Sequence, residues 1–520
     1  MPETDLPPDG SSQQDVFDFL GHGSDGLFPV KQIDTHGAAV FLEGNRALKI
    51  KRAVKFPFLD YSTLAKRKTA CEQELAVGQR FAPTIYRRVV PITRTDNGAL
   101  QIGGDGPVME WAVEMMRFDD SATLDHLARA GSLGPELIDA VADAIAASHL
   151  AAPLAASAPW VASIEPILAD DTAELAAGGF AADDVSALDR GSRAALGRLR
   201  PLLERRGAAG FVRWCHGDLH LANIVILDGK PTLFDAIEFD PIIASVDVLY
   251  DLAFPLMDLL HYGRGSDSAQ LLNRYLAETA DDNFDALSAL PLLLSMRAAI
   301  RAKVLLARPA ADDSIRDANR AIAESYFALA LRLIAPPPPR LIAVGGLSGT
   351  GKSVLARALS GHVPPLPGAV VLRSDVARKR LYGVADTERL PATAYTPDVT
   401  EKVYRGLAER AARILNQGHS VIVDAVFSKP DERQAIEAIA AELAVPFHGV
   451  FLTADLDIRI ARVSGRIGDA SDATPEIVRQ QHSYAHGVIG WTTIDAGGTP
   501  AETLSRTLAA LPQTAQVCST

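Results

Sequence analysis

Cysteine and basic residues are both scarce in this sequence of 520 residues. Its 3 cysteines are scattered and form no CxxC pair, so neither a disulfide framework nor a zinc site is indicated. Lysine and arginine number 51 against 64 aspartates and glutamates, which gives a formal net charge of −13. This balance argues against general binding to duplex nucleic acid or to an anionic membrane, because such binding needs basic surfaces. It leaves contact with a single nucleotide or a strand end open.

Long apolar segments are missing as well. No run of about 18 apolar residues occurs, and even the alanine-rich stretch 141–164 contains His149 and prolines. The first 15 residues are acidic, polar and rich in proline and serine, without the basic and apolar regions of a signal peptide. We therefore expect residues 1–15 to be a disordered tail and the protein to be cytoplasmic.

The composition that is present, 48% hydrophobic and 22% charged, is typical of a globular protein with sizeable cores. The clearest boundary is the run APPPPR at 335–340. Consecutive prolines fit neither a helix interior nor a central strand, and they form a stiff spacer. The alternative is a proline-rich loop within one domain, but a new strand and a glycine-rich loop follow at once. We predict domains at 16–334 and 341–520, joined by this linker.

The two predicted domains differ in their patterns. The first begins with short β-like runs, among them AAVFLEGNRALKIKR, which predicts a hairpin with its turn at Glu43–Arg46. It then becomes helical, with helical periodicity at 134–152, 184–206 and 286–334. The second alternates the apolar strands RLIAVGG, AVVLRSD, SVIVDAVF and FHGVFLTA with helical segments. This alternation predicts a parallel sheet wrapped by helices.

The stretch GLSGTGKS fits the phosphate-loop pattern GxxxxGK[ST]. An apolar strand runs into it and a helix pattern follows, so backbone N–H groups and the helix N-terminus would surround a phosphate. The candidate nucleotide-binding residues are Gly346, Ser348, Gly349, Thr350, Gly351, Lys352 and Ser353. Lys352 would neutralise the β- and γ-phosphates, and Ser353 would bind Mg²⁺. The alternative is a glycine-rich turn without a ligand.

Further polar residues follow this loop. Asp375 ends a strand, and Arg378 lies three residues later on the same helical face. Asp424 ends another strand, where a carboxylate ligand of Mg²⁺ belongs, either direct or through water. Three arginines come next and form either a cationic lid or a solvated helix face: Arg459, Arg462 and Arg466.

Residues 340–490 resemble the P-loop kinases that phosphorylate small molecules and nucleic-acid ends, such as the kinase domain of bacteriophage polynucleotide kinase and the zeta toxins. The resemblance implies that Asp375 is the base that accepts the proton of a substrate hydroxyl. It implies that Arg378 holds substrate or phosphate. With Lys352 and Arg466 as cations at the phosphoryl group, these residues form the candidate catalytic set of the second domain.

The first domain contains HGDLHLAN, in which Asp218 and Asn223 stand in an Asp-x4-Asn spacing, and Asp235 follows. Phosphoryl transfer to a hydroxyl needs a carboxylate at the nucleophile and metal ligands beneath the phosphates. These three residues supply that set in the order used by protein-kinase-like folds. A structural acidic loop is the alternative.

This stretch resembles the aminoglycoside phosphotransferase and choline kinase family, whose catalytic loop reads HGDxHxxN. The resemblance implies that Asp218 is the catalytic base, that Asn223 and Asp235 hold Mg²⁺, and that His216 braces the loop. It implies nucleotide contacts for Lys49 and, in the adenine-holding hinge, for Glu114 and Met116. It further implies a helix partner for Lys49, a structural aspartate and a packed helix histidine: Glu74 (with Glu72 as second choice), Asp251 and His149. The usual glycine-rich phosphate cover is replaced by IDTHGAAVFLEG.

With both resemblances combined, the whole chain is similar to bacterial bifunctional aminoglycoside phosphotransferase/ATP-binding proteins. The expected fold is an α+β protein-kinase-like domain followed by an α/β P-loop domain with a parallel sheet. The expected function is an ATP- and Mg²⁺-dependent kinase with two nucleotide sites that acts on hydroxyl groups of small molecules. Two alternatives remain: a P-loop kinase regulated by a non-catalytic, ligand-sensing domain, and a nucleic-acid-end kinase, which the net charge disfavours.

Overall fold

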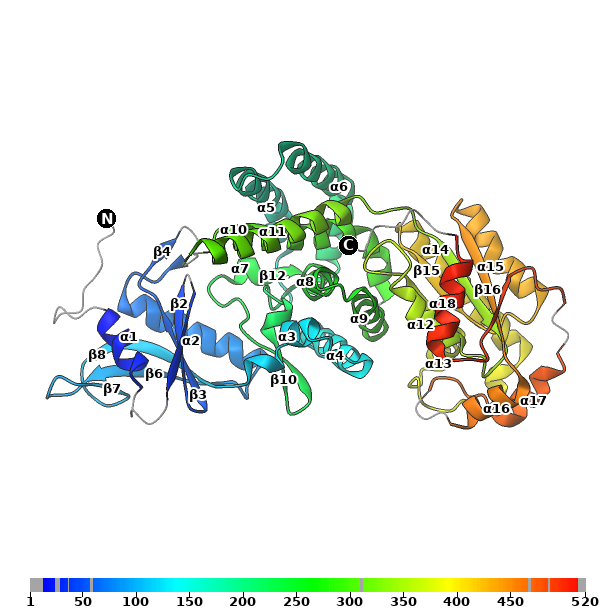
Figure 1. Ribbon diagram of the computed structural model, residues 1–520, viewed down its shortest axis with the longest axis horizontal. Helices are drawn as coiled ribbons and strands as arrows, with labels where there is room; N and C mark the ends of the chain where they lie inside the picture. Colours follow the sequence, from blue (N-terminus) through cyan, green and yellow to red (C-terminus); the bar gives the residue numbers. More distant parts are fainter. Residues whose placement is uncertain are drawn as a thin grey trace. The chain divides into compact units, whose positions relative to one another are not determined.

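The computed structural model of the protein describes residues 13–23, 29–35, 37–56, 59–279, 281–308, 312–465, 469–484 and 487–512 (Figure 1). The chain divides into two compact units: unit 1 is Met1–Ile167 with Arg200–Asp258, and unit 2 is Leu168–Leu199 with Leu259–Thr520. Of the tail predicted for residues 1–15, residues 13–15 begin helix α1 (Gln13–Gly21), and the others lie outside the described residues. The predicted domain boundary at 335–340 stays a prediction.

A six-stranded antiparallel sheet opens unit 1, in the order β1-β2-β3-β8-β6-β7. Its strands are β1 (Val30–Asp34), β2 (Ala38–Glu43), β3 (Arg46–Lys51), β6 (Tyr86–Arg94), β7 (Leu100–Ile102) and β8 (Val108–Met116), beside a small hairpin of β4 (Lys55–Phe56) and β5 (Leu59–Asp60). Glu43 pairs with Arg46, which confirms the predicted hairpin. Alternate side chains of the sheet pack against α1 on one face and against α2 (Leu64–Phe81) on the other.

The rest of unit 1 is mainly helical. Its elements are η1 (Asp120–Ala122), α3 (Leu124–Arg129), α4 (Pro135–Ala151), β9 (Val212–Trp214), η2 (Leu221–Asn223), β10 (Ile224–Leu227), β11 (Lys230–Leu233), α7 (Pro241–Ala244) and β12 (Ser245–Asp247). The helices α5 (Ser157–Ala177), α6 (Ala182–Ala208) and α8 (Val248–His261) are divided between the units. β10 and β11 form an antiparallel hairpin that separates the candidate residues Asn223 and Asp235. Helices α4 and α6 confirm the periodicity predicted for 134–152 and 184–206.

Unit 2 contains four further helical elements before the P-loop domain. They are α9 (Gly265–Glu278), η3 (Asp281–Ala289), α10 (Leu290–Leu306) and α11 (Asp313–Ile334). The helical stretch predicted over 286–334 is therefore divided. Asp312 caps the start of α11, because its side chain accepts a hydrogen bond from the Ile315 N–H at 2.9 Å.

The second predicted fold is a five-stranded parallel sheet in the order β14-β15-β13-β16-β17. The strands are β13 (Leu341–Gly346), β14 (Val370–Arg373), β15 (Val421–Asp424), β16 (Phe447–Thr453) and β17 (Thr492–Asp495). The helices are α12 (Lys352–Ser360), α13 (Ser374–Leu381), η4 (Ala392–Tyr395), α14 (Pro397–Asn416), α15 (Pro430–Glu442), α16 (Leu456–Ser464), α17 (Pro475–His482) and α18 (Pro500–Ala510). Both predicted folds are confirmed. Only β17 lacked a signal, since Ile494 alone is buried in its TTID.

The edge strand β14 is covered by α9. The Asn273 side chain accepts from the Val371 N–H at 2.7 Å and donates to Ala369 O at 3.0 Å, so its amide takes the place of a neighbouring strand. Next to it, two bonds of 2.7 Å join Arg413 of α14 to Asp285 of η3. Within unit 2, α9 is thus hydrogen-bonded to β14, the strand that leads to Asp375, and η3 is bonded to α14. None of the described helices combines the length and the apolar character needed to cross a membrane.

Candidate active sites

The loop after β9 holds the first candidate site. The N–H groups of His216 and Gly217 donate to the Asp251 carboxylate at 3.2 and 2.9 Å, and His149 Nε2 lies 3.1 Å from the same carboxylate. Burial lowers the pKa of His216, so its ring is neutral. Its Nε2 carries the proton, because it contacts Phe234 O at 2.8 Å and a carbonyl only accepts. Asp251 and His216 therefore fix the loop from two sides.

Asp218 and Asn223, the predicted base and metal ligand, lie together in this loop. Asn223 Nδ2 donates to the main-chain oxygen of Asp218 at 2.9 Å and lies 3.3 Å from its Oδ2. The Asp218 side chain is 42% exposed, whereas Asn223 is buried. An exposed carboxylate on a braced loop is accessible to a substrate hydroxyl.

Asp235, the second predicted metal ligand, follows β11. Its φ of 59° is left-handed and turns the chain sharply after the strand. Its N–H donates to the Tyr86 hydroxyl oxygen at 3.1 Å, and Lys49 Nζ lies 2.6 Å from its Oδ1. Although burial opposes it, the Lys49 ammonium holds the pKa of Asp235 at about 2, so the carboxylate stays charged.

Glu74 pairs with two lysines. Lys49 Nζ lies 2.7 Å from its Oε1 and Lys51 Nζ 2.6 Å from its Oε2, and Lys51 also pairs with Glu238. Although burial opposes it, Asp235 and Glu74 raise the pKa of Lys49, and the two ammonium groups lower that of Glu74. Lys51 and Glu238 were not predicted, yet the KIK spacing places both lysines on one face of β3.

Other predicted residues of this site have protein partners or stand apart. The Glu72 side chain, the second choice as lysine partner, is 56% exposed and lies outside the network. Glu114 is buried at the end of β8 and accepts from Arg88 Nε at 2.9 Å. The N–H of Met116 donates to Ile85 O at 2.8 Å. Contacts of Glu114 and Met116 with a nucleotide stay predictions.

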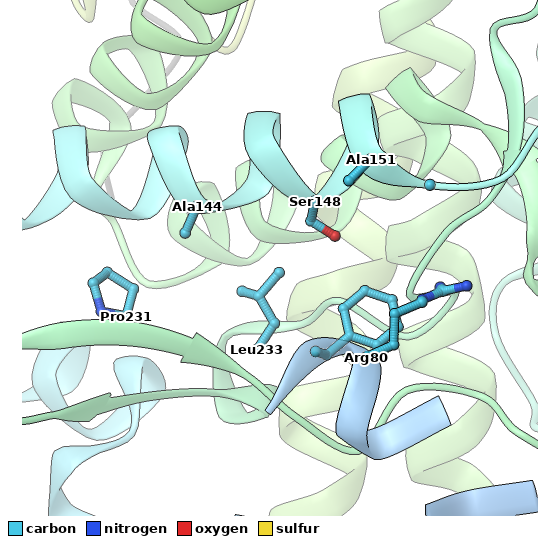
Figure 2. Close-up of a pocket in the computed structure, with 8 residues that line it drawn as sticks. Arg80, Ala144, Ser148, Ala151, Pro231 and Leu233 are labelled. Carbon is cyan, nitrogen blue, oxygen red and sulfur yellow. The ribbon is translucent and has the colours of Figure 1, made fainter. Parts of the chain in front are cut away.

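A pocket of about 230 Å³ lies beside the residues that support the loop (Figure 2). Its lining residues are Arg80, Phe81, Ala144, Ser148, Ala151, Ala152, Pro231 and Leu233. Arg80 donates to Trp214 O at 2.8 Å, and the Phe81 ring packs edge-on against His216 with centroids 5.2 Å apart. No predicted site residue lines this pocket, so it is separate from the candidate chemistry.

In unit 2, residues 346–353 form a tight loop between β13 and α12. Gly346, Gly349 and Gly351 have φ angles of 138°, 87° and 93°, which side chains disfavour. A Cβ atom on Gly349 would lie 2.6 Å from Arg459 O, so the loop leaves no room for a side chain there. Gly351 precedes the first turn of α12, whose N–H groups lack intrahelical partners and suit an anion.

Ser348 and Thr350 are held by the protein. The Ser348 N–H donates to Gln481 Oε1 at 2.8 Å, and Arg459 Nε donates to Ser348 O at 2.9 Å. The buried Thr350 hydroxyl donates to Leu347 O at 2.8 Å. Arg459 is therefore neither a solvated nor a lid residue here, because its buried side chain supports the phosphate loop.

Ser353 and Asp424, the predicted metal ligands, meet at the first turn of α12. The Ser353 hydroxyl donates to Asp424 Oδ2 at 2.5 Å. Lys352 Nζ donates to Leu347 O at 3.3 Å, so the ammonium lies over its own loop. A hydroxyl and a carboxylate oxygen are hard donors, which is the set that Mg²⁺ prefers.

Arg373 is a site residue that was not predicted. In the register of β14 and β15 it pairs directly with Asp424. Its Nη2 lies 3.2 Å from Ser353 Oγ and 3.0 Å from Asp469 Oδ1, and its Nε lies 3.5 Å from Asp424 Oδ2. The available signal was its position at the end of a strand, two residues before Asp375.

Asp375 stands in the first turn of α13 and is half-buried. Burial, followed by the charge of Asp424, raises the pKa of Asp375, against the effect of Lys352 and Arg373. The nearby Ser471 side chain also lowers this pKa. A carboxylate with a raised pKa accepts a proton more readily than an ordinary one, as a general base requires.

The remaining arginines are used within the protein or lie outside the described residues. Arg378 donates to Ala394 O at 2.6 Å. Arg462 donates to Gly498 O at 2.7 Å. Arg466 lies outside the described residues. The catalytic roles of Arg378 and Arg466 stay predictions.

Two family models match successive parts of the chain. The phosphotransferase enzyme family matches residues 51–290, a range that contains Glu74 and the loop with Asp218. The AAA domain family matches residues 341–487, a range that contains the phosphate loop and Asp375. The order of the two matches is the order of the two predicted domains.

Two relatives differ in how much of the chain they match. An uncharacterized protein of Mycobacterium tuberculosis is 29% identical over 460 residues, which is 85% of this chain and 88% of that protein. An adenylyl-sulfate kinase of Myxococcus xanthus is 31% identical over 117 residues, which is 22% of this chain and 59% of that protein.

Solved structures of two kinases are similar to portions of this chain. A choline kinase of Cryptosporidium parvum Iowa II covers 62% of this chain and 95% of its own, with 11% identity and a TM-score of 0.40. A gluconokinase of Sinorhizobium meliloti 1021 covers 33% of this chain and 90% of its own, with 21% identity and a TM-score of 0.25.

Proposed function

We propose that this chain, an ATP-dependent kinase that joins a domain of the phosphotransferase enzyme family to an AAA-family P-loop domain, carries two separate sites of phosphoryl transfer. Each site passes the γ-phosphoryl group of ATP to a hydroxyl group of a small molecule. One observation carries the proposal: each unit holds its own lysine, its own aspartate suited to act as a base, and its own pair of oxygen-bearing side chains suited to a metal ion.

In unit 2, the carboxylate of Asp375 accepts the proton of the substrate hydroxyl. The hydroxyl oxygen forms a bond to the γ-phosphorus, and the bond from that phosphorus to its bridging oxygen breaks. ADP leaves with the electron pair of this bond, and the substrate leaves as a phosphate ester. Lys352 and the N–H groups at the start of α12 stabilise the charge on the phosphoryl oxygens.

In unit 1, the exposed carboxylate of Asp218 accepts the proton of the substrate hydroxyl, as Asp375 does in unit 2. Lys49 reaches the α- and β-phosphates, and Glu74 holds its ammonium group in place. Asn223 and Asp235, at the two ends of the β10–β11 hairpin, serve as metal ligands. The balance of bonds and protons is the same as in unit 2.

Both donor sets fit Mg²⁺. Ser353 and Asp424 would hold the ion in unit 2, where their oxygen atoms already meet at 2.5 Å. Asn223 and Asp235 would hold it in unit 1, where the pKa of Asp235 near 2 keeps that ligand charged. When bound, Mg²⁺ neutralises phosphate charge.

A second candidate function follows from the ion pairs of unit 1. Lys49 forms ion pairs with Glu74 and also with Asp235, the proposed metal ligand. The charge of the lysine and the charge of the ligand therefore already neutralise each other. Such a unit could bind a nucleotide as a signal while only unit 2 turns over.

Equilibrium titration with a non-hydrolysable ATP analogue and Mg²⁺ tests the number of sites. We expect two nucleotides per chain in the wild type and in Asp218→Asn, and weaker binding at one site in Lys352→Ala. A parallel screen of ATP consumption against sugars, aminoglycosides, nucleosides and oligonucleotide ends identifies the substrate class. A single nucleotide per wild-type chain would contradict the proposal.

A further inference from the structure

The sequence around Asp375 is strongly basic, and this pattern alone would suggest a substrate with an anionic group. Between residues 370 and 382 four side chains are basic: Arg373, Arg378, Lys379 and Arg380. A basic side chain without protein partners would attract a carboxylate, sulfate or phosphate group of the substrate. In the structure, however, all four side chains are bonded to acceptor groups of unit 2 itself.

Two of the four are bound by residues 469–472, which we term the acidic strap. Asp469 Oδ1 accepts from Arg373 Nη2 at 3.0 Å, and Asp472 Oδ1 lies 2.9 Å from Lys379 Nζ. The Lys379 side chain is only 1% exposed. These contacts match two of the four cations with carboxylates that the protein supplies.

The strap is anchored at Asp472 and passes near the proposed base. Asp472 Oδ2 accepts from the Tyr395 hydroxyl at 2.5 Å and from the Leu390 N–H at 3.1 Å. Between the two acidic residues, Ser471 lies near enough to Asp375 to lower the pKa of its carboxyl group. The acidic strap therefore borders the place where the substrate hydroxyl must meet Asp375.

The other two cations are turned to main-chain oxygen atoms. Arg378 Nη1 donates to Ala394 O at 2.6 Å. Arg380 Nη2 donates to Ala277 O at 2.9 Å, and its Nη1 lies 3.5 Å from Asp281 Oδ1. Both arginines therefore hold α13 to neighbouring elements.

We infer that the substrate of the P-loop site is a neutral polyhydroxyl molecule, of the sugar or polyol class, and not a carboxylate, sulfate or phosphate ester. The inference rests on the proposed role of Asp375 as base. Among the described residues, an anionic group near this base would meet the carboxylates of Asp375, Asp469 and Asp472, besides that of Asp424. The Lys352 ammonium, which also acts on Asp375, is assigned to the phosphates of ATP. It would also compete for cations whose partners would be left unpaired in a half-buried site. A neutral hydroxyl can instead donate a hydrogen bond to these carboxylates.

Matched substrate pairs test the inference in the full-length Asp218→Asn protein, which reports the P-loop site. The pairs are glucose with gluconate, ribose with ribonate, and glycerol with glycerate. We expect kcat/KM for ATP-dependent phosphorylation to be about tenfold or more higher for the better neutral member than for its anionic counterpart, since like charges near the base cost more than 1.4 kcal/mol. Calorimetric titration of the same pairs, with a non-hydrolysable ATP analogue present, measures the preference without turnover.

Asp472→Asn removes the charge that matches Lys379, so we expect it to raise the anionic-to-neutral ratio of kcat/KM by about tenfold. Asp469→Asn removes one of the two carboxylates that Arg373 contacts and serves if Asp472→Asn folds poorly. Glu476→Gln is the matched control, because it removes the same charge from an exposed side chain on α17. It should leave the ratio unchanged.

The outcomes separate this inference from the proposed function. Tighter binding of the neutral members without any turnover would contradict the proposed function and retain the preference. Equal or better binding and turnover of the anionic members in the Asp218→Asn protein would overturn the inference. An unchanged ratio in both strap variants would overturn it as well.

Discussion

The two candidate sites provide for the phosphates of a nucleotide in different ways. In unit 1, Lys49, Glu74 and Asp235 come from distant parts of the chain, and ion pairs join them, of which the Lys49–Glu74 pair is buried and the Asp235 side chain is 46% exposed. In unit 2, one continuous stretch, 346–353, forms the cradle with its main chain. The comparison teaches that unit 1 depends on charge balance in a buried network, whereas unit 2 depends on backbone conformation.

The two proposed bases differ as well. The Asp218 side chain is 42% exposed on its loop. Asp375 is half-buried and lies near Ser471 of the acidic strap. The proposed base of unit 1 is therefore more accessible to solvent than that of unit 2.

The largest expected effect is the loss of one activity without the other. Lys352→Ala removes a cation at the transferred phosphoryl group, so turnover that depends on the P-loop should fall by about two decades or more. Turnover that depends on Asp218 should not change. Initial rates with labelled ATP measure both, and Lys402→Ala, an exposed lysine of α14, is the control. A parallel fall of both activities would break the comparison, because it would make the two sites one.

The buried ion-pair network of unit 1 should contribute to stability, which we do not expect of the phosphate loop of unit 2. Lys51→Met leaves Glu238 without its lysine and Glu74 with one lysine instead of two, so we expect the free energy of unfolding of unit 1 to fall by about 3 kcal/mol. Urea unfolding measures the loss, with the exposed Lys31→Met as control. Wild-type stability in Lys51→Met would show that the network does not hold unit 1 together.

The pH dependence should differ between the sites because the pKa of Asp375 is raised. Below its pKa Asp375 carries a proton and cannot accept another, so P-loop turnover should be lost as pH falls, and at higher pH than for an ordinary aspartate. Arg373→Gln removes a cation that opposes the rise, so the acidic limb should move further up. Rate profiles against pH, recorded in the Asp218→Asn protein, measure the shift, and a limb that moved down would contradict the assignment.

The smallest expected effect concerns the covered edge of the P-loop sheet. A fragment of residues 341–520 lacks Asn273 and Asp285, so we expect it to fold but to unfold roughly 5 °C below a fragment of residues 262–520. Thermal unfolding followed by circular dichroism compares them. Equal midpoints would show that the α9–η3 segment adds nothing to the P-loop domain and would support the boundary predicted at 335–340.

The contiguous parts of both sites could be predicted from sequence, and the parts made by packing could not. The phosphate loop and HGDLHLAN each place their chemistry within eight residues, so spacing alone indicates it. Lys51 and Arg373 were missed because their roles come from strand register and burial. Arg378 follows the expected motif, yet its guanidinium contacts Ala394, which spacing on a helix cannot reveal.

The choice between Glu74 and Glu72 shows the same limit. Both residues lie within one helical turn, and only the packing of α2 on the sheet decides which carboxylate reaches Lys49. The fold itself was easier to predict, since long apolar strands and helical periodicity report burial directly. The exception is β17, whose polar residues give no such signal.

The central claim is that each unit transfers phosphate on its own, and Asp218→Asn tests it most directly. The amide keeps the size of the side chain and removes its proton-accepting charge. Single-turnover assays with labelled ATP compare the wild type, Asp218→Asn and Lys352→Ala on one substrate panel. We expect the two variants to abolish different activities, or different steps of one conversion, while both nucleotides still bind to Asp218→Asn. Full wild-type activity of Asp218→Asn on every accepted substrate would contradict the account and leave unit 2 as the only catalytic unit.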